Sequence, residues 1–580
     1  MPSQPAVLSL NVQAAMLRNL RPQRQFEIMV RHLFDRMLNN EAFGEDAAAR
    51  MTELAGAIAL PGMLVALFLF PAYHLPPPLH LPRPLMSQAC DHLFFCTYSF
   101  VILGLAMIFQ WDTLFPDLLD IYVLTSLPIE RRRMLWGRIT ALVIFLGLVQ
   151  VETSTLGTIF FPGVADLKLG FAHHLYAHAM AVSISGIFAA ALFLALQGLL
   201  GCMPFPAIAS RIASVAKIIS VIALLMILFL FPLAAHSIEA LLAPPTLARF
   251  FPPFWFLGVY ESLLYGSSAE PIFHQLAHTA LWSTAVLAFV GVVLYPVAYN
   301  RRVRILIEGT GTSTQVRASL LQRPLHALLA RIPTARAIFH FCAQTLSRLP
   351  RLHLYLAMYA GVGFALILSE LLNFRSVDGR MQVVVPVDGV RMVVTLVAFW
   401  TVMGLRTALL SPLLLKGSWV FRVIDGKPKE ESLRAARTLV FTIAATFILL
   451  TVMILHFVEP LSMRTISTTV TELLLGLGLS LILTDLAFLS LRTIPFTTAR
   501  IKTIHQLPIT LVLYLLVFPY LALKVQMMDL WDSPTPWHLL RVAINFAILH
   551  SLLMLARKQV IASEPPTPEI LYMGLGLRDE

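Results

Sequence analysis

The sequence predicts an all-helical protein that crosses a membrane about twelve times. Three observations point to this fold class: long uncharged runs, few charged residues overall, and basic residues gathered in every second gap between the runs. Of the 580 residues, 58% are hydrophobic and 13% are charged, and the mean hydropathy is +0.77. A soluble chain of this length needs more polar surface. Apolar runs of about 20 residues can cross the hydrocarbon as helices, which satisfy their own backbone polar groups.

Twelve apolar segments are predicted as spans, six on each side of a basic, polar stretch. In chain order they are Ala55–Tyr73, His92–Gln110, Ile139–Phe161, Leu175–Leu200, Ile218–His236, Leu276–Tyr299, Leu354–Ser369, Val387–Leu405, Thr438–Val458, Leu473–Leu491, Leu507–Leu523 and Trp537–Leu555. The expected parts are a cytoplasmic N-terminus with an interfacial helix (1–54), a first six-span half (55–299), a cytoplasmic linker (300–351), a second six-span half (352–557) and a cytoplasmic tail (558–580).

The basic residues predict the orientation. Of the 43 Lys and Arg residues, 34 fall in the two termini and in the gaps after the even-numbered spans. Lys and Arg stay on the cytoplasmic side, so both ends are expected in the cytoplasm and the protein in a bacterial inner membrane. The net charge of +11 follows from this topology and from contact with anionic membrane lipid, so no nucleic-acid partner is expected.

The N-terminal region is expected to lie on the membrane surface. The first fifty residues lack an apolar core, so no cleavable signal is predicted. Gln25–Leu38 has helical apolar spacing with Arg31 and Arg36 on its polar side. This pattern favours a helix on the inner leaflet, and a short soluble cap helix is the alternative.

Three landmarks suggest that the two halves are a tandem duplication. Pro204-Phe205 and Pro495-Phe496 each stand between a span and an arginine that precedes the next span. Arg138 and Arg434 stand at the entrances to the third and ninth spans, and Trp255 and Trp537 lie near the sixth and twelfth. Halves with an even number of spans share one orientation. Chance matches between any two sets of spans are the alternative.

The gap after the second span has an unusual composition. Residues 111–133 mix Asp112, Asp117 and Asp120 with large apolar side chains and end in three arginines. The segment is too charged to span and too apolar for a free linker, so an amphipathic helix at the cytoplasmic face is predicted. Thr407–Lys429 is the expected counterpart in the second half. Such a helix either docks a cytoplasmic partner or simply coats the membrane surface.

The gap after the fifth span is the second unusual connection. Ser237–His274 is long and contains the run Phe250–Phe256, in which Pro252 and Pro253 stand among aromatic residues. Proline interrupts helices, whereas aromatic side chains prefer the membrane interface. A segment that dips into the bilayer and returns is predicted, and an aromatic cap over the outer surface is the alternative.

Together these features resemble the permeases of type-2 ATP-binding-cassette exporters. Phe115–Ile129 is similar to the coupling segment of that family, and Phe251–Gly258 is similar to its aromatic re-entrant region. The resemblance implies an export permease with no ATP site of its own, whose ATP is bound by a separate cytoplasmic P-loop ATPase. It also implies an ATPase-coupling set of Phe115, Asp117, Asp120, Leu127, Pro128, Arg131, Trp419 and Arg422, and a re-entrant set of Pro252, Pro253 and Trp255. Six-span permeases dimerise, but this chain would hold both halves, so a homodimer is not required.

No enzymatic activity is expected. The sequence has no G-x-x-x-x-G-K-[ST] motif, and the glycine-rich stretch at 309–314 lacks its lysine. Membrane glycosyltransferases resemble one another in carrying acidic residues in the first outer loop, and residues 71–90 contain none. His174 and His178 share a helical face that could bind a metal, but interfacial histidines beside lipid headgroups are commoner. No metal site and no cofactor are therefore predicted, and the four cysteines have no metal-binding spacing.

Polar residues within spans predict the translocation path. Glu152 in the third span and Asp485 in the tenth are costly in lipid and usually face a cavity or the bundle interior. Gln197 is expected to join them, and Arg406 to neutralise a carboxylate from the cytoplasmic side. An internal ion pair or a helix–helix hydrogen bond is an equal alternative for the carboxylates.

The runner-up function is a proton-coupled secondary transporter of the major facilitator type. Its twelve spans and cytoplasmic middle loop fit this chain equally well. That class has a glycine- and arginine-rich signature after the second span, however, and residues 111–133 contain no glycine. Dissipating the proton gradient while the ATP level is kept unchanged separates the two hypotheses. Transport by a proton-coupled transporter stops, whereas transport by an ATP-driven exporter continues.

Overall fold

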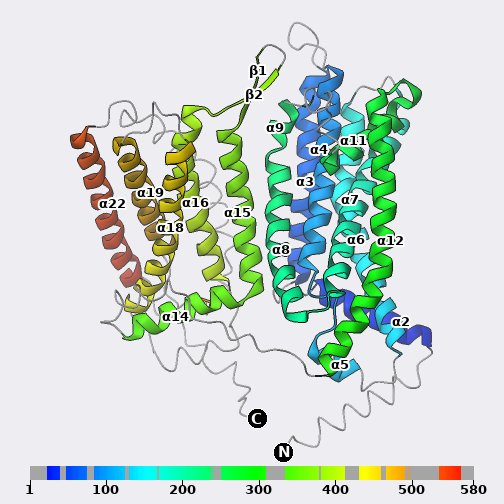
Figure 1. Ribbon diagram of the computed structural model, residues 1–580, viewed down its shortest axis with the longest axis horizontal. Helices are drawn as coiled ribbons and strands as arrows, with labels where there is room; N and C mark the ends of the chain where they lie inside the picture. The colour runs from blue at the N-terminus through cyan, green and yellow to red at the C-terminus, as the bar shows by residue number, and fades with distance from the viewer. Residues whose placement is uncertain are drawn as a thin grey trace, which may run out of the picture. The chain divides into compact units, whose positions relative to one another are not determined.

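A computed structural model describes residues 22–38, 47–74, 84–124, 130–165, 169–236, 238, 250–308, 333–377, 380–411, 430–458, 466–489, 495–496 and 535–563. Within them, 11 helices are long and apolar enough to cross a membrane. They are α3 (Ala47–His74), α4 (Leu85–Phe109), α6 (Arg131–Val164), α7 (Phe171–Gly201), α8 (Pro206–Phe229), α12 (Pro271–Ile307), α15 (Pro350–Leu371), α16 (Val387–Leu410), α18 (Glu430–Val458), α19 (Ile466–Ala487) and α22 (Pro536–Ser563) (Figure 1).

Each of these helices overlaps one predicted span, and the predicted eleventh span, Leu507–Leu523, lies outside the described residues. Large apolar side chains are exposed along them, including Phe68 at 84%, Trp282 at 71% and Phe289 at 69%. A soluble protein rarely exposes so much apolar surface, whereas lipid covers it in a membrane. The prediction of an all-helical, multi-pass membrane protein is thus confirmed for the described part of the chain.

The chain divides into two compact units, Met1–Thr314 and Gln315–Glu580, and the division falls within the predicted linker. In the first unit α4 is the central helix, with side chains buried along most of its length. It packs against α6, α7, α8 and the short helix α11 (Pro252–Tyr265), while α12 packs along α7. Helices α3 and α6 cross closely because Gly62 meets the backbone of Gly157.

The predicted surface helix before the first span is α2 (Pro22–Leu38). It packs against α6, and its buried side chains Met29, Leu33 and Met37 recur every four residues on one face. This packing places α2 at the same end of the first unit as α5 (Leu118–Leu124), and α11 lies toward the other end (Figure 1).

In the second unit α16 is central and packs against α15, α18 and α19, and α22 packs against α19. The polar stretch 300–351, predicted as a linker, also contains helical structure. Helix α12 continues to Ile307, and a further helix, α14 (Pro333–Arg348), packs against α18. Its apolar residues are spaced for one helical face despite the basic surroundings, and Ile338, Phe339 and Cys342 are buried there.

A short hairpin is the one departure from helical structure among the described residues. Strands β1 (Asn373–Val377) and β2 (Arg380–Val384) pair antiparallel between α15 and α16, with Asn373 opposite Val384. Three consecutive valines, Val383–Val385, contribute to this connection, and β-branched residues favour strands.

Candidate functional site

Among the described residues of the first unit, the chain that follows α4 makes polar contacts with many other helices. After Phe109 the backbone turns through Gln110–Phe115 and enters α5 at Leu118. We call residues 110–124 the elbow. Seven residues make α5 too short to be stable alone, so its position depends on contacts with the rest of the unit.

Arg138, on the second turn of α6, is the main anchor of the elbow. Its side chain is 2% exposed although it carries a full charge. Its guanidinium donates to the carbonyl oxygens of Thr113 at 2.7 Å and Phe115 at 3.0 Å, and it pairs with the carboxylate of Asp120. A buried guanidinium is stable only with such complete pairing. Arg138 thus ties both the turn and α5 to α6.

The surface helix α2 provides the second anchor. Arg36 pairs with the carboxylate of Asp120 and also with that of Asp117, at 2.5 Å. Burial raises the pKa of Asp120, but the charge of Arg138, the backbone N–H of Asp117 and the charge of Arg36 outweigh it, so the pKa lies below the ordinary value of 3.8. Asp120 is therefore ionised at neutral pH.

Three further helices hold the turn of the elbow. The hydroxyl of Tyr295 on α12 donates to Leu114 O at 2.6 Å, and the amide of Gln197 on α7 donates to Trp111 O at 2.5 Å. On α8, Lys217 pairs with Asp112 at 2.8 Å. The side chain of Gln110 itself donates to Met37 O of α2 at 3.0 Å. The elbow is thus bonded to α2, α6, α7, α8 and α12.

The structure brings together three of the predicted coupling residues. Asp117 and Asp120 share Arg36, and the ring of Phe115 lies 5.8 Å from that of Tyr295. Arg131 begins α6. Leu127, Pro128, Trp419 and Arg422 lie outside the described residues. The sequence identified Arg138 only as a basic entrance, although its burial makes it central. On the outer surface of α5, Leu118 is 49% exposed and Tyr122 is 70% exposed.

The predicted path residues have separate environments. Glu152 is half-buried within α6, and Gln197 belongs to the elbow network. In the second unit, Asp485 pairs with Arg437 of α18 and lies 2.5 Å from His550 Nδ1 of α22, while Arg406 donates to Ala487 O at 3.2 Å. The carboxylate of Asp485 is therefore held by Arg437 and His550, two partners that the sequence pattern does not indicate.

At the other end of the first unit lies the predicted re-entrant segment. Pro252 and Pro253 begin α11, where the missing N–H of proline costs no helical hydrogen bond. The 14 residues of α11 extend only about 21 Å, which is less than the hydrocarbon thickness. Its buried side chains contact α4, α7 and α12, and Trp255 packs edge-on against Phe188 of α7.

The position of α11 depends on a close approach to α12. A Cβ atom on Gly258 would stand 2.6 Å from Phe273 O and 2.6 Å from the Cβ of Leu276. Gly258→Ala is expected to push α11 away from α12 and to destabilise the protein by about 1–3 kcal/mol, measured by thermal unfolding in detergent. Gly147→Ala on α6 is the matched control, because its Cβ would meet nothing within 4 Å. Equal melting temperatures for the two variants would contradict this packing.

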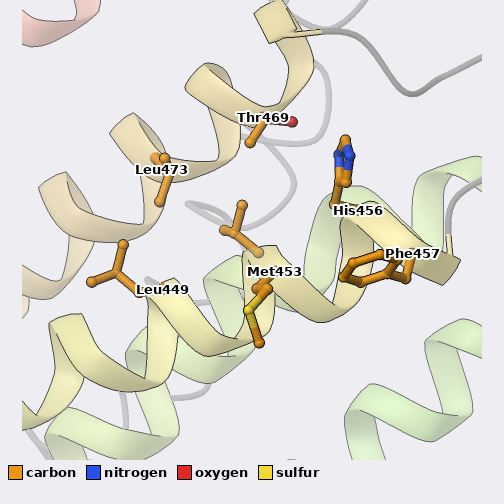
Figure 2. Close-up of a pocket in the computed structure, with 7 residues that line it drawn as sticks. Leu449, Met453, His456, Phe457, Thr469 and Leu473 are labelled. Carbon is orange, nitrogen blue, oxygen red and sulfur yellow. The ribbon is translucent and has the colours of Figure 1, made fainter.

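A shallow apolar pocket lies between α18 and α19 in the second unit, with a volume of about 350 Å³. Figure 2 shows the side chains that line it on both helices. They are Leu449, Val452, Met453, His456, Phe457, Thr469 and Leu473. This lining suits hydrocarbon, and its many apolar groups offer few hydrogen bonds to a polar substrate.

Among the residues that the structure describes, no three His, Cys, Asp or Glu side chains are grouped so that they could hold a metal ion. The hydroxyl of Tyr260 instead lies between His174 Nε2, at 2.9 Å, and His178 Nδ1, at 3.0 Å. The helical spacing of the two histidines is visible in the sequence, but their contact with Tyr260 is not, because the phenol comes from α11. In comparisons with known protein families, curated proteins and solved structures, nothing matches this chain.

Proposed function

We propose that this protein is the membrane permease of an exporter driven by a separate ATPase subunit. The observation that supports this most is the elbow, which joins an exposed short helix to five other helices of its unit through hydrogen bonds and ion pairs. A surface helix that merely coats the membrane does not need a buried arginine or these multiple ties. A docking helix needs both, because they transmit its movement.

The transmission follows from the bonding pattern. A partner that displaces α5 moves Asp120, which is paired with Arg138 of α6 and Arg36 of α2. Displacement of the turn also acts on Tyr295 of α12 and Lys217 of α8. Buried charged pairs tolerate little extension, so these helices follow α5. ATP hydrolysis in the partner would thereby tilt spans that line a path through the membrane.

The end of the first unit that carries α2 and α5 is assigned to the cytoplasm. It holds Arg36, Arg138, Lys217 and also Arg301, which donates to Pro204 O at 2.9 Å. Basic residues collect on the cytoplasmic side, where the ATPase and its ATP are found. Both termini are then cytoplasmic, and the membrane is the inner membrane of a bacterium.

Similar internal packing in the two units supports a duplicated, six-plus-six arrangement. In the first unit α4 packs against α6 and α7, and α12 against α7; in the second, α16 packs against α18 and α19, and α22 against α19. Each unit also has an amphipathic helix, α2 or α14, against its third span. The first span differs, because α3 packs against α6 whereas α15 packs against α16. With two halves in one chain, a homodimer is not required.

The test is capture of the partner by the elbow. Affinity purification of the gently solubilised protein from its native membrane is expected to retain a P-loop ATPase with measurable ATP hydrolysis. Leu118→Ser with Tyr122→Ser removes the two exposed apolar side chains of α5 and is expected to lower ATPase retention at least tenfold, since such anchors contribute about 1–2 kcal/mol or more each. Phe250→Ser removes an aromatic side chain near α11 that is even more exposed than Leu118 and Tyr122, and it is expected to leave retention unchanged.

The proposal fails if the wild-type complex contains no ATPase and hydrolyses no ATP. It also fails if transport in vesicles stops on collapse of the proton gradient while ATP remains, because that result identifies a secondary transporter.

A further inference from the structure

The first two turns of α12 carry two histidines on one side of the helix. His274 and His278 are four residues apart in a helix that begins at Pro271. Residues with this spacing are neighbours on a helix surface, with about 5–6 Å between their Cβ atoms. Two imidazole rings at this separation can each direct one nitrogen toward a single point between them. The helix itself therefore positions the pair, without a contribution from a second element.

The pair faces away from the helix bundle. His278 is exposed and His274 is half-buried, whereas Phe273 and Leu276 of the same two turns belong to a buried cluster with side chains of α11. Trp282, one turn beyond His278 on the same side, is 71% exposed. Exposed tryptophans of membrane proteins collect at the interface between lipid and water. The two histidines therefore lie at the level of the lipid headgroups, where water and dissolved ions reach them.

Neither imidazole is engaged by the part of the chain that the structure describes. His274 and His278 make no hydrogen bond, ion pair or ring contact with a described residue. The histidines of α7 differ in this respect, since His174 and His178 are buried and both contact the hydroxyl of Tyr260. The ring nitrogens of the α12 pair are thus available to a ligand.

Two available imidazoles favour one class of ion. Imidazole is a good ligand for Zn²⁺, Cu²⁺ and Ni²⁺, whereas Mg²⁺ and Ca²⁺ prefer oxygen. Two ligands on one helix bind an ion more tightly than either alone, because the second bond forms within the same molecule. A site of this kind needs no third side chain, and the described His, Cys, Asp and Glu residues form no group of three around a metal position.

We propose that His274 and His278 form a binding site for one divalent transition-metal ion of the Zn²⁺ class, at the end of the first unit that carries α11. Each histidine supplies one ring nitrogen, and water occupies the other coordination positions. The bound ion joins the first turn of α12 to the second. These turns also hold α11 through Phe273 and Leu276, so metal binding stabilises the segment on which the position of α11 depends.

Titration of the full-length protein with Zn²⁺ in detergent tests the site. The protein carries no polyhistidine tag, and Mg²⁺ is present in excess. Calorimetry is expected to show one Zn²⁺ per chain with a dissociation constant in the micromolar range, and Cu²⁺ is expected to bind more tightly than Zn²⁺. Zn²⁺ should also raise the melting temperature, since a ligand that binds only the folded state stabilises it.

The decisive variant exchanges two neighbouring residues, His278→Thr with Thr279→His. It keeps the composition of an exposed surface, since Thr279 is exposed as well, but it places the histidines five residues apart. Residues with that spacing point about 140° apart around a helix, so they cannot share an ion. The affinity for Zn²⁺ is expected to fall at least tenfold, and the rise in melting temperature should disappear. His274→Gln is expected to give the same loss.

His32→Gln is the matched control. His32 is an exposed histidine on α2 with no second histidine one turn away, so this variant is expected to keep the wild-type affinity. Electron paramagnetic resonance of bound Cu²⁺ gives an independent measurement. It should show two coordinated imidazole nitrogens in the wild type and in His32→Gln, and fewer in the exchanged variant. Each variant is first shown to be folded by size-exclusion chromatography.

Two results overturn the proposal. One is a wild-type protein that binds no Zn²⁺ in the micromolar range, which would leave the histidines as neighbours of lipid headgroups only. The other is an exchanged variant that binds Zn²⁺ as tightly as the wild type. If the exchanged variant does not fold, His274→Gln and the number of imidazoles bound to Cu²⁺ decide. The test needs neither a transported substrate nor an ATPase, so it is independent of the export function.

Discussion

Arg138→Met is expected to detach α5 from the helix bundle and to lower the stability of the protein by about 3–5 kcal/mol, the usual result of removing one partner of a buried ion pair. Arg138 is the partner of Asp120 and the donor to Thr113 O and Phe115 O. Methionine fills a similar volume but offers no donor, so two carbonyl oxygens lose their donor and the mostly buried carboxylate of Asp120 keeps Arg36 as its remaining cationic partner. Unfolding in detergent gives the stability, and limited proteolysis within 110–124 reports on detachment.

Arg132→Met is the matched control, because Arg132 lies on the exposed side of the same helix. It is expected to change stability by less than about 0.5 kcal/mol. If the two variants behave alike, Arg138 does not anchor the elbow. In the ATPase complex, Arg138→Met should still bind the partner through α5 but transmit its movement poorly. Transport is therefore expected to fall further than ATP hydrolysis.

The same contacts predict how the anchoring depends on pH. The pKa of Asp120 is lower in the folded protein than its ordinary value of 3.8, despite its burial, because Arg138 and Arg36 stabilise the carboxylate. A lowered pKa adds stability that is fully present above the ordinary value and is lost as the pH falls through the lower, folded value. The difference in stability between wild type and Asp120→Asn should thus be constant from pH 5 to 8 and shrink only below about pH 4.

The sequence predicted the spans better than the connections, for a physical reason. A span is determined by local composition, since lipid accepts only long apolar helices. Helix α14 lies within a basic, polar stretch that was predicted as a linker, although its apolar residues have helical spacing and form the face that α18 covers. The hairpin of β1 and β2 was missed because two short strands give little periodicity.

The candidate sites show the same limit. Acidic residues among apolar ones predicted an amphipathic segment at Asp117 and Asp120, but their shared partner Arg36 lies 81 and 84 residues away. His92 and Glu261, whose side chains lie 2.6 Å apart, are 169 residues apart in the sequence. Such pairs arise from the packing of helices, which no local pattern encodes. A charge within a span is a usable signal of unusual chemistry, but the sequence does not identify its partner.

Variants at Asp485 can distinguish a structural role of this side chain from a role in transport. Its side chain is 2% exposed and is paired with Arg437, which is 11% exposed, and with His550. Arg437→Leu leaves the carboxylate with His550 alone and is expected to destabilise the protein by about 3–5 kcal/mol, and Asp485→Leu leaves the buried guanidinium without its carboxylate at a similar cost. Arg434→Leu, an exposed position on the same helix, is the control and should be nearly neutral.

The double variant Arg437→Leu with Asp485→Leu removes both charges together. Because the desolvation of two buried ions disappears with them, its stability is expected to return to within about 1 kcal/mol of wild type, as measured by the same unfolding experiment. A cost equal to the sum of the single changes would show that the two side chains do not act as a pair. The recovered fold then allows a transport measurement. If Asp485 serves only to join α18, α19 and α22, the double variant transports normally; if it lines the path as the sequence predicts, the variant is stable but inactive, since leucine supplies neither charge nor hydrogen bond to a passing polar substrate.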